Sequence, residues 1–264
     1  MQQLDRIQSR RRGLIELGEL MRALRVLAAA HLAEAQAALP AALAYRQTLR
    51  EAWAALPEAA PEVAEGAALQ LLLGAEHGFT GAYSERLLAA SQPELPLALV
   101  GRRAHARAVE RKRDCVWNEE FSTRPATVPD LARRLAARVR DWPGPVTLIH
   151  AVYRHGSRFE LGRGPLWPLP VATATAPAGP PRTQLPTTEL RAGVAGALLV
   201  AELSVALLEA LASENAARMT VLDAAEHTLE GKLTTLKVEE RSARQGAITA
   251  ELLDVVTGAE AQRR

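Results

Sequence analysis

The C-terminal part of the chain is the feature that most limits its fold. From Thr187 or Thr188, either of which is a plausible N-cap, to about Ala261 the sequence contains no proline and keeps helical spacing. Apolar residues recur there every seven positions and at neighbouring seam positions, namely Leu222, Leu229, Leu236 and Ala243, with Leu233 and Ala247 beside them. At about 1.5 Å per residue such a helix would be on the order of 100 Å long. No globular core of a 264-residue chain covers that length, so the helix must pair with a second long helix.

The only partner within the chain is the N-terminal segment, from about Leu4 to Leu56, whose one internal helix breaker is Pro40. Its seven-residue repeat consists of Ile7, Leu14, Met21, Ala28 and Ala35, with Leu17, Leu24 and His31 three positions after three of them. Gly13 and Gly18 each lower intrinsic helix stability by up to about 1 kcal/mol relative to Ala, so this helix depends on a partner. We therefore predict an antiparallel coiled coil of residues 1–56 and 188–264.

The segment between the two helices has a different texture. Four apolar runs of strand length, "AALQLLLG", "LPLALVG", "DCVWNEEF" and "PVTLIHAVY", alternate with helical patterns near Tyr83–Ala90, Arg103–Arg111 and Val128–Asp141. This alternation predicts an inserted Rossmann-like α/β domain of four to five mostly parallel strands over residues 67–162. The Pro-, Ala- and Thr-rich residues 163–187 are predicted to form a connector that holds neither a strand ladder nor a helix.

Composition and charge exclude several classes of protein. The apolar fraction is 48% but the aromatic fraction is only 4%, which favours closely packed helices. A net charge of +2 gives no whole-chain field for nucleic acid, and the basic clusters at Arg6–Arg12 and Arg102–Arg113 are predicted to be solvated helix faces or protein contacts. The N-terminus lacks the apolar core of a signal peptide. The most apolar run is interrupted by Arg191, Glu202 and Glu209, so we expect a soluble, intracellular protein that can sit on a membrane complex.

Residue types that carry catalysis or bind metals form no convincing group. Cys115 is the single cysteine, which excludes an internal disulfide, and its apolar neighbours predict a buried side chain. His77, His150 and His155 match no standard metal-ligand spacing. The stretch "EHGFTGAY" follows a strand and opens a helix but lacks the third glycine of a dinucleotide-binding loop, so we interpret it as a tight packing turn. We predict no catalytic residue, no metal site and no cofactor.

Four separated segments together resemble the gamma subunit of F-type ATP synthases: "ALRVLAAAHLAEAQ", "GFTGAYSERLL", "ASENAARMTVLDAA" and "ARQGAITAELLDVVTGAEA". The resemblance extends over nearly the whole chain, and the last segment is the most specific. It implies the central rotor stalk of a rotary ATPase, whose coiled coil stands inside a ring of alpha and beta subunits. It further implies an epsilon-type subunit and the membrane c-ring as partners. The implied location is peripheral, on the cytoplasmic face of the bacterial inner membrane, with no catalytic nucleotide site in the subunit itself.

The resemblance also implies which residues face the surrounding ring. Arg218, Gln245, Thr249 and Glu251 match family positions that meet ring loops, and Arg22 and Arg25 match a basic position facing the same ring. Gln245 and Thr249 lie four residues apart on one helix face, so the pair can bond one loop. The alternative is that these are ordinary solvated side chains on helix surfaces.

The chain departs from the usual family sequence near its N-terminus, and two other functions are considered besides the rotor stalk. Leu24, Val26 and His31 replace residues of the usual "AMKMVAAAKL" element, a divergence that resembles the N-ATPase branch. A static coiled-coil scaffold or tether with an α/β recognition domain is the main alternative function. It gives no reason to keep Gln245, Thr249 and Gly258 in place of ordinary heptad residues. A small Rossmann-like enzyme is the third, and the lack of a converging catalytic group argues against it.

Overall fold

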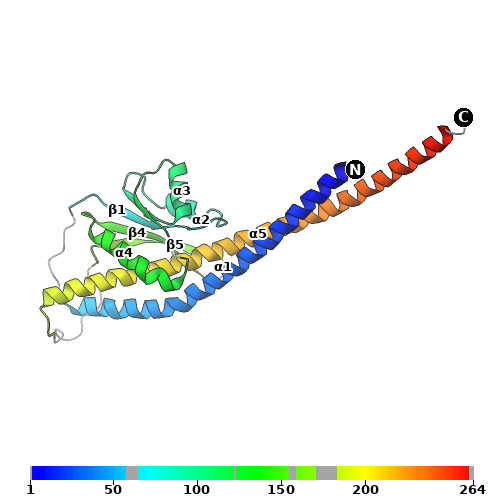
Figure 1. Ribbon diagram of the computed structural model, residues 1–264. Coiled ribbons are helices and arrows are strands. Elements are labelled where there is room, and N and C mark those ends of the chain that lie inside the picture. The colour runs from blue at the N-terminus through cyan, green and yellow to red at the C-terminus, as the bar shows by residue number, and fades with distance from the viewer. Residues whose placement is uncertain (1, 58–64, 122, 155–158, 171–182, 262–264) are drawn as a thin grey trace. The chain divides into compact units, whose positions relative to one another are not determined.

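The computed structural model describes residues 2–57, 65–121, 123–154, 159–170 and 183–261. It divides into two compact units, one of residues 1–27 with 221–264 and one of residues 28–220. Two long helices lie at the ends of the chain, α1 (Gln2–Ala55) and α5 (Thr187–Ala261) (Figure 1). Each contributes residues to both units. The two long terminal helices predicted from the heptad pattern are therefore present, and α1 continues through Pro40.

The unit of residues 28–220 is built on a five-stranded sheet. The strands are β1 (Leu69–Leu73), β2 (Leu97–Val100), β3 (Cys115–Glu119), β4 (Val146–Tyr153) and β5 (Phe159–Trp167). Their order is β3-β2-β1-β4-β5; the first four are parallel and β5 pairs antiparallel with β4. The predicted inserted α/β domain with a mostly parallel sheet is confirmed.

Strand β5 corrects the predicted end of this domain. The boundary at residue 162 and the connector from residue 163 cut through the strand, which continues to Trp167. Pro165 pairs with Thr147 in the ladder. The prediction that this stretch holds no ladder is wrong for residues 163–167, because an edge strand tolerates a proline that a central strand would not. Residues 171–182 of the predicted connector lie outside the described part of the chain.

Helices cover both faces of the sheet. Helices α2 (Tyr83–Ala89) and α3 (Arg102–Glu110) pack on one face, in a core with Leu72, Leu87, Leu97, Leu99, Ala104 and Ile149. Helix α4 (Val128–Arg140), which follows the short 3-10 helix η1 (Pro125–Thr127), packs with α5 on the other face, in a core with Leu69, Leu71, Val100, Leu131, Leu135, Leu203 and Leu207. Helices α2 and α3 lead to β2 and β3 on one side of β1, and α4, on the opposite face, leads to β4 on the other side. The strand order therefore reverses between β1 and β4.

The unit of residues 1–27 and 221–264 is an antiparallel helix pair. Ion pairs join Arg11 to Glu240 and Arg22 to Glu226, so the helices run in opposite directions. The predicted seam of α5 is confirmed at Leu222, Leu229 and Leu236, which are buried, whereas Leu233, Ala243 and Ala247 are half-buried.

The predicted seam of α1 is partly wrong. Met21 is buried as expected, but Leu17 is 43% exposed and Gly18 is buried in its place. A methyl group added to Gly18 would lie 3.3 Å from Cδ2 of Leu229. The second seam position therefore falls four residues after Leu14, where a glycine makes room for a leucine of the partner helix.

Helices α1 and α5 each contain a stretch long and apolar enough to cross a membrane, by length and composition only. We expect the charges of Arg191, Glu202 and Glu209 to exclude a membrane span in α5. Length and composition alone do not exclude it. The α5 stretch is 61% buried inside the protein, as in the core helix of a globular domain, whereas that of α1 is 11% buried. One or two such helices are weak evidence for a membrane span.

Candidate partner-binding surfaces

The paired helices carry a charged cluster that contains two predicted site residues. Nε of Arg22 lies 2.9 Å from Glu226, and Nη1 of Arg25 lies 2.8 Å from Asp223 and 3.8 Å from Glu226. The Arg22 side chain is 59% exposed and that of Arg25 is 43% exposed. Exposed ion pairs of this kind contribute about 0 to 1 kcal/mol, so another carboxylate can replace Asp223 or Glu226 at little cost.

Further along the same helix pair, Glu240 places a charge in the apolar seam. It is 9% exposed and is contacted by Gln8 (3.2 Å), Arg11 (3.2 Å) and Arg244 (3.3 Å). A charge between packed helices is stable only opposite its specific partners, so this cluster favours one register of α1 against α5. The sequence reasoning missed it; the available signal was an acidic residue at seam spacing, four positions after Leu236.

The last part of α5, residues 245–261, is called the C-terminal segment below. Gln245, Thr249 and Glu251 are all exposed in it, and among the described residues the side chains of Gln245 and Glu251 make no hydrogen bond. The Thr249 hydroxyl donates to the backbone carbonyl of Gln245 at 2.9 Å, which leaves its oxygen free to accept. Five large apolar side chains of the segment are more than half exposed, namely Ile248, Leu252, Leu253, Val255 and Val256. Polar and apolar groups are thus both presented to the surroundings.

The structure places Arg218 in the other unit and in the interior. Its residue exposure is 8%, and all three guanidinium nitrogens donate within the chain. Nε donates to the carbonyl of Gly78 (3.1 Å), Nη1 donates to Asn215 (2.7 Å), and Nη2 pairs with Glu214. A contact with an outside subunit would have to displace one of these bonds.

The neighbouring Glu214 lies at the carboxyl ends of β1 and β4, beside the point where the strand order reverses. Its carboxylate is 2% exposed and accepts the backbone N–H groups of Glu76 (3.1 Å) and His77 (3.2 Å), which follow β1. The Ser213 hydroxyl donates to the carbonyl of Ala151 on β4 (3.3 Å). Doubly wound sheets bind their ligands in this crevice, and here α5 fills it.

Two more buried polar groups complete the crevice. Glu76 is 5% exposed; it accepts the backbone N–H groups of Arg102 (3.0 Å) and Phe121 (2.8 Å) and pairs with the Arg102 guanidinium. The Tyr83 hydroxyl donates to the carbonyl of Ala210 on α5 (3.2 Å). Burial raises the pKa of Tyr83 well above its usual value, and the nearby Glu214 charge raises that pKa further, so the phenol stays a donor.

Sequence reasoning found Arg218 but missed Glu214 and Glu76. The signal for Glu214 was the polar triplet Ser213-Glu214-Asn215 inside an otherwise apolar helical run. A helical segment that is buried on all sides tolerates a charged residue only opposite a hydrogen-bonding or charged partner. The triplet therefore indicates that another part of the fold supplies such a partner.

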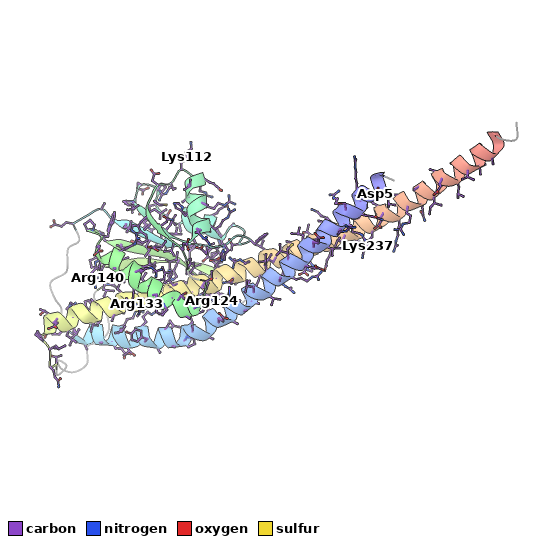
Figure 2. All side chains as sticks on the ribbon, in the orientation of Figure 1. Asp5, Lys112, Arg124, Arg133, Arg140 and Lys237 are labelled. Carbon is purple, nitrogen blue, oxygen red and sulfur yellow. The ribbon has the colours of Figure 1, made fainter. Side chains whose placement is uncertain are left out.

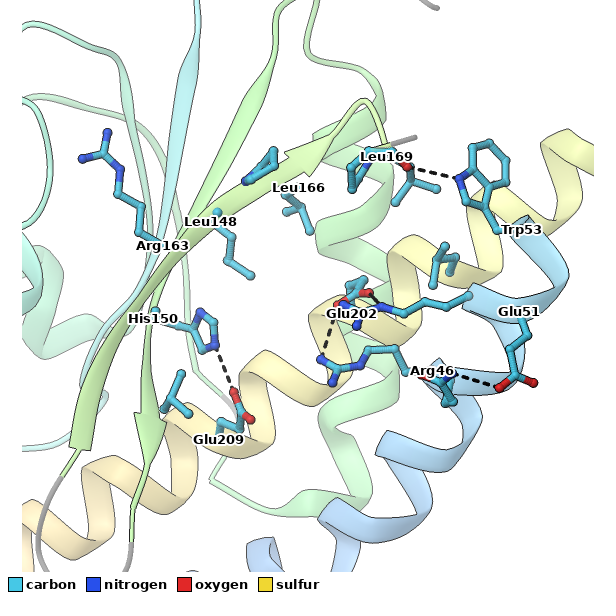
Figure 3. A pocket seen from close by; sticks show the side chains of 18 residues that line it. Arg46, Glu51, Trp53, Leu148, His150, Arg163, Leu166, Leu169, Glu202 and Glu209 are labelled. Carbon is cyan, nitrogen blue, oxygen red and sulfur yellow. Dashed lines mark hydrogen bonds and ion pairs between the residues drawn. The ribbon is translucent and has the colours of Figure 1, made fainter. Parts of the chain in front are cut away.

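A cavity of about 680 Å³ lies between α1, α5 and the β4–β5 hairpin (Figure 3). Three ion pairs lie along it: Arg46 and Arg50 contact Glu202 at 3.4 and 2.6 Å, and His150 contacts Glu209 at 3.0 Å. Among the described residues no three His, Cys, Asp or Glu side chains are grouped to hold a metal ion; His155 lies outside them.

Basic residues are spread over the surface, both in the predicted basic stretch Arg102–Arg113 and on α4. Lys112 follows α3, and Arg133 and Arg140 lie on α4, all exposed (Figure 2). Several cations of the predicted basic stretch are engaged by acids, such as Arg107 with Glu110 at 2.6 Å. This arrangement suits solvated helix faces, as expected.

Comparison with known proteins agrees with the geometry. The family model described as "ATP synthase" matches residues 3–262. The ATP synthase gamma chain of Moorella thermoacetica is 29% identical over 269 residues, covering 92% of this chain and 93% of that protein. The gamma chain of Thermosynechococcus vestitus is 52% identical over 58 residues, which is 22% of this chain and 18% of that protein's length.

Solved structures show the same fold. A chain of the Euglena gracilis mitochondrial ATP synthase, from an assembly of OSCP, F1 and c-ring, aligns with a TM-score of 0.73 at 17% identity, covering 98% of this chain and 94% of that one. A chain of the Tetrahymena thermophila central stalk and c-ring aligns with a TM-score of 0.56 at 16% identity, covering 78% of this chain and 99% of that one. With a family model over nearly its whole length, this chain belongs to the ATP synthase gamma family.

Proposed function

We propose that the chain is the central-stalk subunit of a rotary F-type ATPase. It couples ion-driven rotation of a membrane ring to ATP synthesis or hydrolysis in a surrounding ring of alpha and beta subunits. The observation that carries this is the C-terminal segment, whose apolar residues Ile248, Leu252, Val255 and Val256 are more than half exposed on a long helix. A helix end of that composition requires an enclosing partner.

The residues proposed to meet the ring are Gln245, Thr249 and Glu251 on the C-terminal segment, with Arg22 and Arg25 on α1. Free amide and carboxylate groups and weak exposed ion pairs support this role. A stalk that turns past successive subunits must exchange its partners at every step, and contacts of about 0 to 1 kcal/mol each exchange without trapping one angle. Arg218 is not among them, because its guanidinium nitrogens are all bonded inside the chain.

The subunit is proposed to be non-catalytic. The crevice in which a Rossmann-like sheet would bind a nucleotide is filled by α5, and the carboxylate of Glu214 holds the backbone N–H groups of Glu76 and His77. A phosphate group would meet this buried negative charge in place of free donors. Catalysis in the complex then belongs to other subunits.

The proposed partners are the alpha and beta subunits, an epsilon-type subunit and the membrane c-ring. The family's complex is membrane-associated, and the related Euglena and Tetrahymena chains come from assemblies that contain a c-ring. For this chain we propose a peripheral position on the cytoplasmic face of the bacterial inner membrane.

Purification from native membranes tests the proposal. An affinity tag on the beta subunit should retain this chain, after detergent extraction, at about one copy per three beta subunits, together with ATPase activity. Deletion of the chain should abolish ion pumping by the same membranes. Elution of the chain free of alpha and beta subunits would refute the rotary function and favour a static scaffold.

A further inference from the structure

We propose that Ser213, Glu214 and Arg218, called the α5 latch, transmit torque between the α/β domain and helix α5. The inference rests on the proposed rotary function. It assigns to Arg218 a positioning role inside the subunit in place of the ring contact expected from its sequence position.

Glu214 occupies an anion site at the end of β1. The loop after β1 presents the N–H groups of Glu76 and His77 where other doubly wound sheets hold an anionic ligand. Here the anion is a side chain of the shaft helix itself, 2% exposed. Because this anion is covalently part of α5 it cannot diffuse away, and the loop and the helix move together while its hydrogen bonds are intact.

Arg218 contacts both Glu214 and the loop after β1. Its guanidinium pairs with Glu214, one helical turn earlier, and its Nε donates to the carbonyl of Gly78 in the same loop. The loop is therefore bound to α5 through the N–H groups of Glu76 and His77, which donate, and through the carbonyl of Gly78, which accepts. Ser213 adds a bond to Ala151 on the adjacent strand β4.

Apolar and polar contacts between α5 and the sheet resist motion differently. Leucine contacts between α5 and the sheet, such as those of Leu207 and Leu211, resist separation but depend little on direction. Hydrogen bonds weaken steeply when their angles fall below about 120°. Rotation of α5 within the domain would therefore break the hydrogen bonds of the α5 latch first. It would also leave the charges of Glu214 and Arg218 buried without partners, so the latch resists this rotation more strongly than the apolar contacts do.

The test uses the assembled complex in sealed membrane vesicles. Glu214→Gln keeps the size of the side chain but removes the charge that faces Arg218 and the two N–H groups. We expect unloaded ATP hydrolysis, measured with an uncoupler, to match the parent, and the ion gradient built by ATP hydrolysis to fall several-fold. Glu202→Gln is the matched control: it lies on the same helix and is ion-paired, but with Arg46 and Arg50 of α1, and it should keep the gradient.

Three results overturn the inference. An unchanged gradient in Glu214→Gln, while hydrogen exchange at the amides of Glu76 and His77 is accelerated, means that the latch exists but bears no torque. A parallel fall of complex content and unloaded hydrolysis in both Glu214→Gln and Arg218→Lys means a purely structural role. An equal loss in Glu202→Gln means a general effect of charge removal. If Glu214→Gln fails to assemble, Arg218→Lys, which keeps the charge but loses the forked contacts to Gly78 and Asn215, must show the gradient defect instead. Failure of the rotary function itself is distinguishable, because the chain would then not co-purify with beta.

Discussion

Replacing the two polar handles of the C-terminal segment tests the working surface of the stalk. The double variant Gln245→Leu with Thr249→Val removes an amide and a hydroxyl that lie one turn apart on an exposed helix face. The Thr249 hydroxyl already donates to the Gln245 carbonyl, so it offers an outside partner its oxygen, and the Gln245 amide offers both donors and an acceptor.

The expected loss of ATP turnover follows from the number of hydrogen bonds that the two side chains can make. Two hydrogen bonds to a neighbouring loop, at about 0.5 to 1.5 kcal/mol each, amount to about 1 to 3 kcal/mol. If they form only in the rate-limiting step of rotation, ATP turnover of the complex falls by about 5-fold to about 150-fold. Assembly should be largely retained, because both side chains are exposed and neither belongs to the buried seam.

The assay is steady-state ATP hydrolysis by purified complex of matched subunit content. Thr235→Val is the control for the hydroxyl, since Thr235 is also exposed on α5 and donates to a backbone carbonyl four residues earlier, that of Gly231 at 3.2 Å. It should leave turnover unchanged. Unchanged turnover in the double variant would refute the assignment of Gln245 and Thr249, and an equal loss in Thr235→Val would show that only the helix was weakened.

Three other predictions concern the chain itself. Gly13→Ala should raise the opening free energy of the neighbouring amides, measured by hydrogen exchange, by about 1 kcal/mol, because a methyl group there meets nothing within 4 Å. Gly18→Ala should raise it less, because the added methyl group would lie 3.3 Å from Leu229. Equal increases in the two variants would contradict the observed seam. Burial raises the pKa of Cys115, so iodoacetamide should alkylate the native thiol with a midpoint at higher pH than the unfolded chain, and a midpoint at or below the unfolded value would be inconsistent with this packing. The isolated chain should aggregate through its exposed apolar C-terminal segment, and a sharply melting monomer would contradict the proposed need for an enclosing partner.

The repetitive elements could be predicted because their signals are local. Heptad spacing identified both long helices, and four apolar runs identified β1 to β4. Strand β5 was missed because Gly162, Gly164 and Pro165 weaken the period-two pattern, and only pairing with β4 makes this segment a strand. The motif resemblance identified Gln245, Thr249 and Glu251 as exposed candidates, but it could not tell that Arg218 is buried.

By itself the sequence determined that two long helices pair and that an α/β domain is inserted between them, because hydrophobic periodicity is written residue by residue along the chain. Only the tertiary structure decided that Gly18, and not Leu17, lies in the seam, since that choice depends on where Leu229 of the partner helix sits. It alone placed Glu214 against the N–H groups of Glu76 and His77. The physical reason is that a buried carboxylate is stable only beside donors, and those donors come from a loop far away in the sequence.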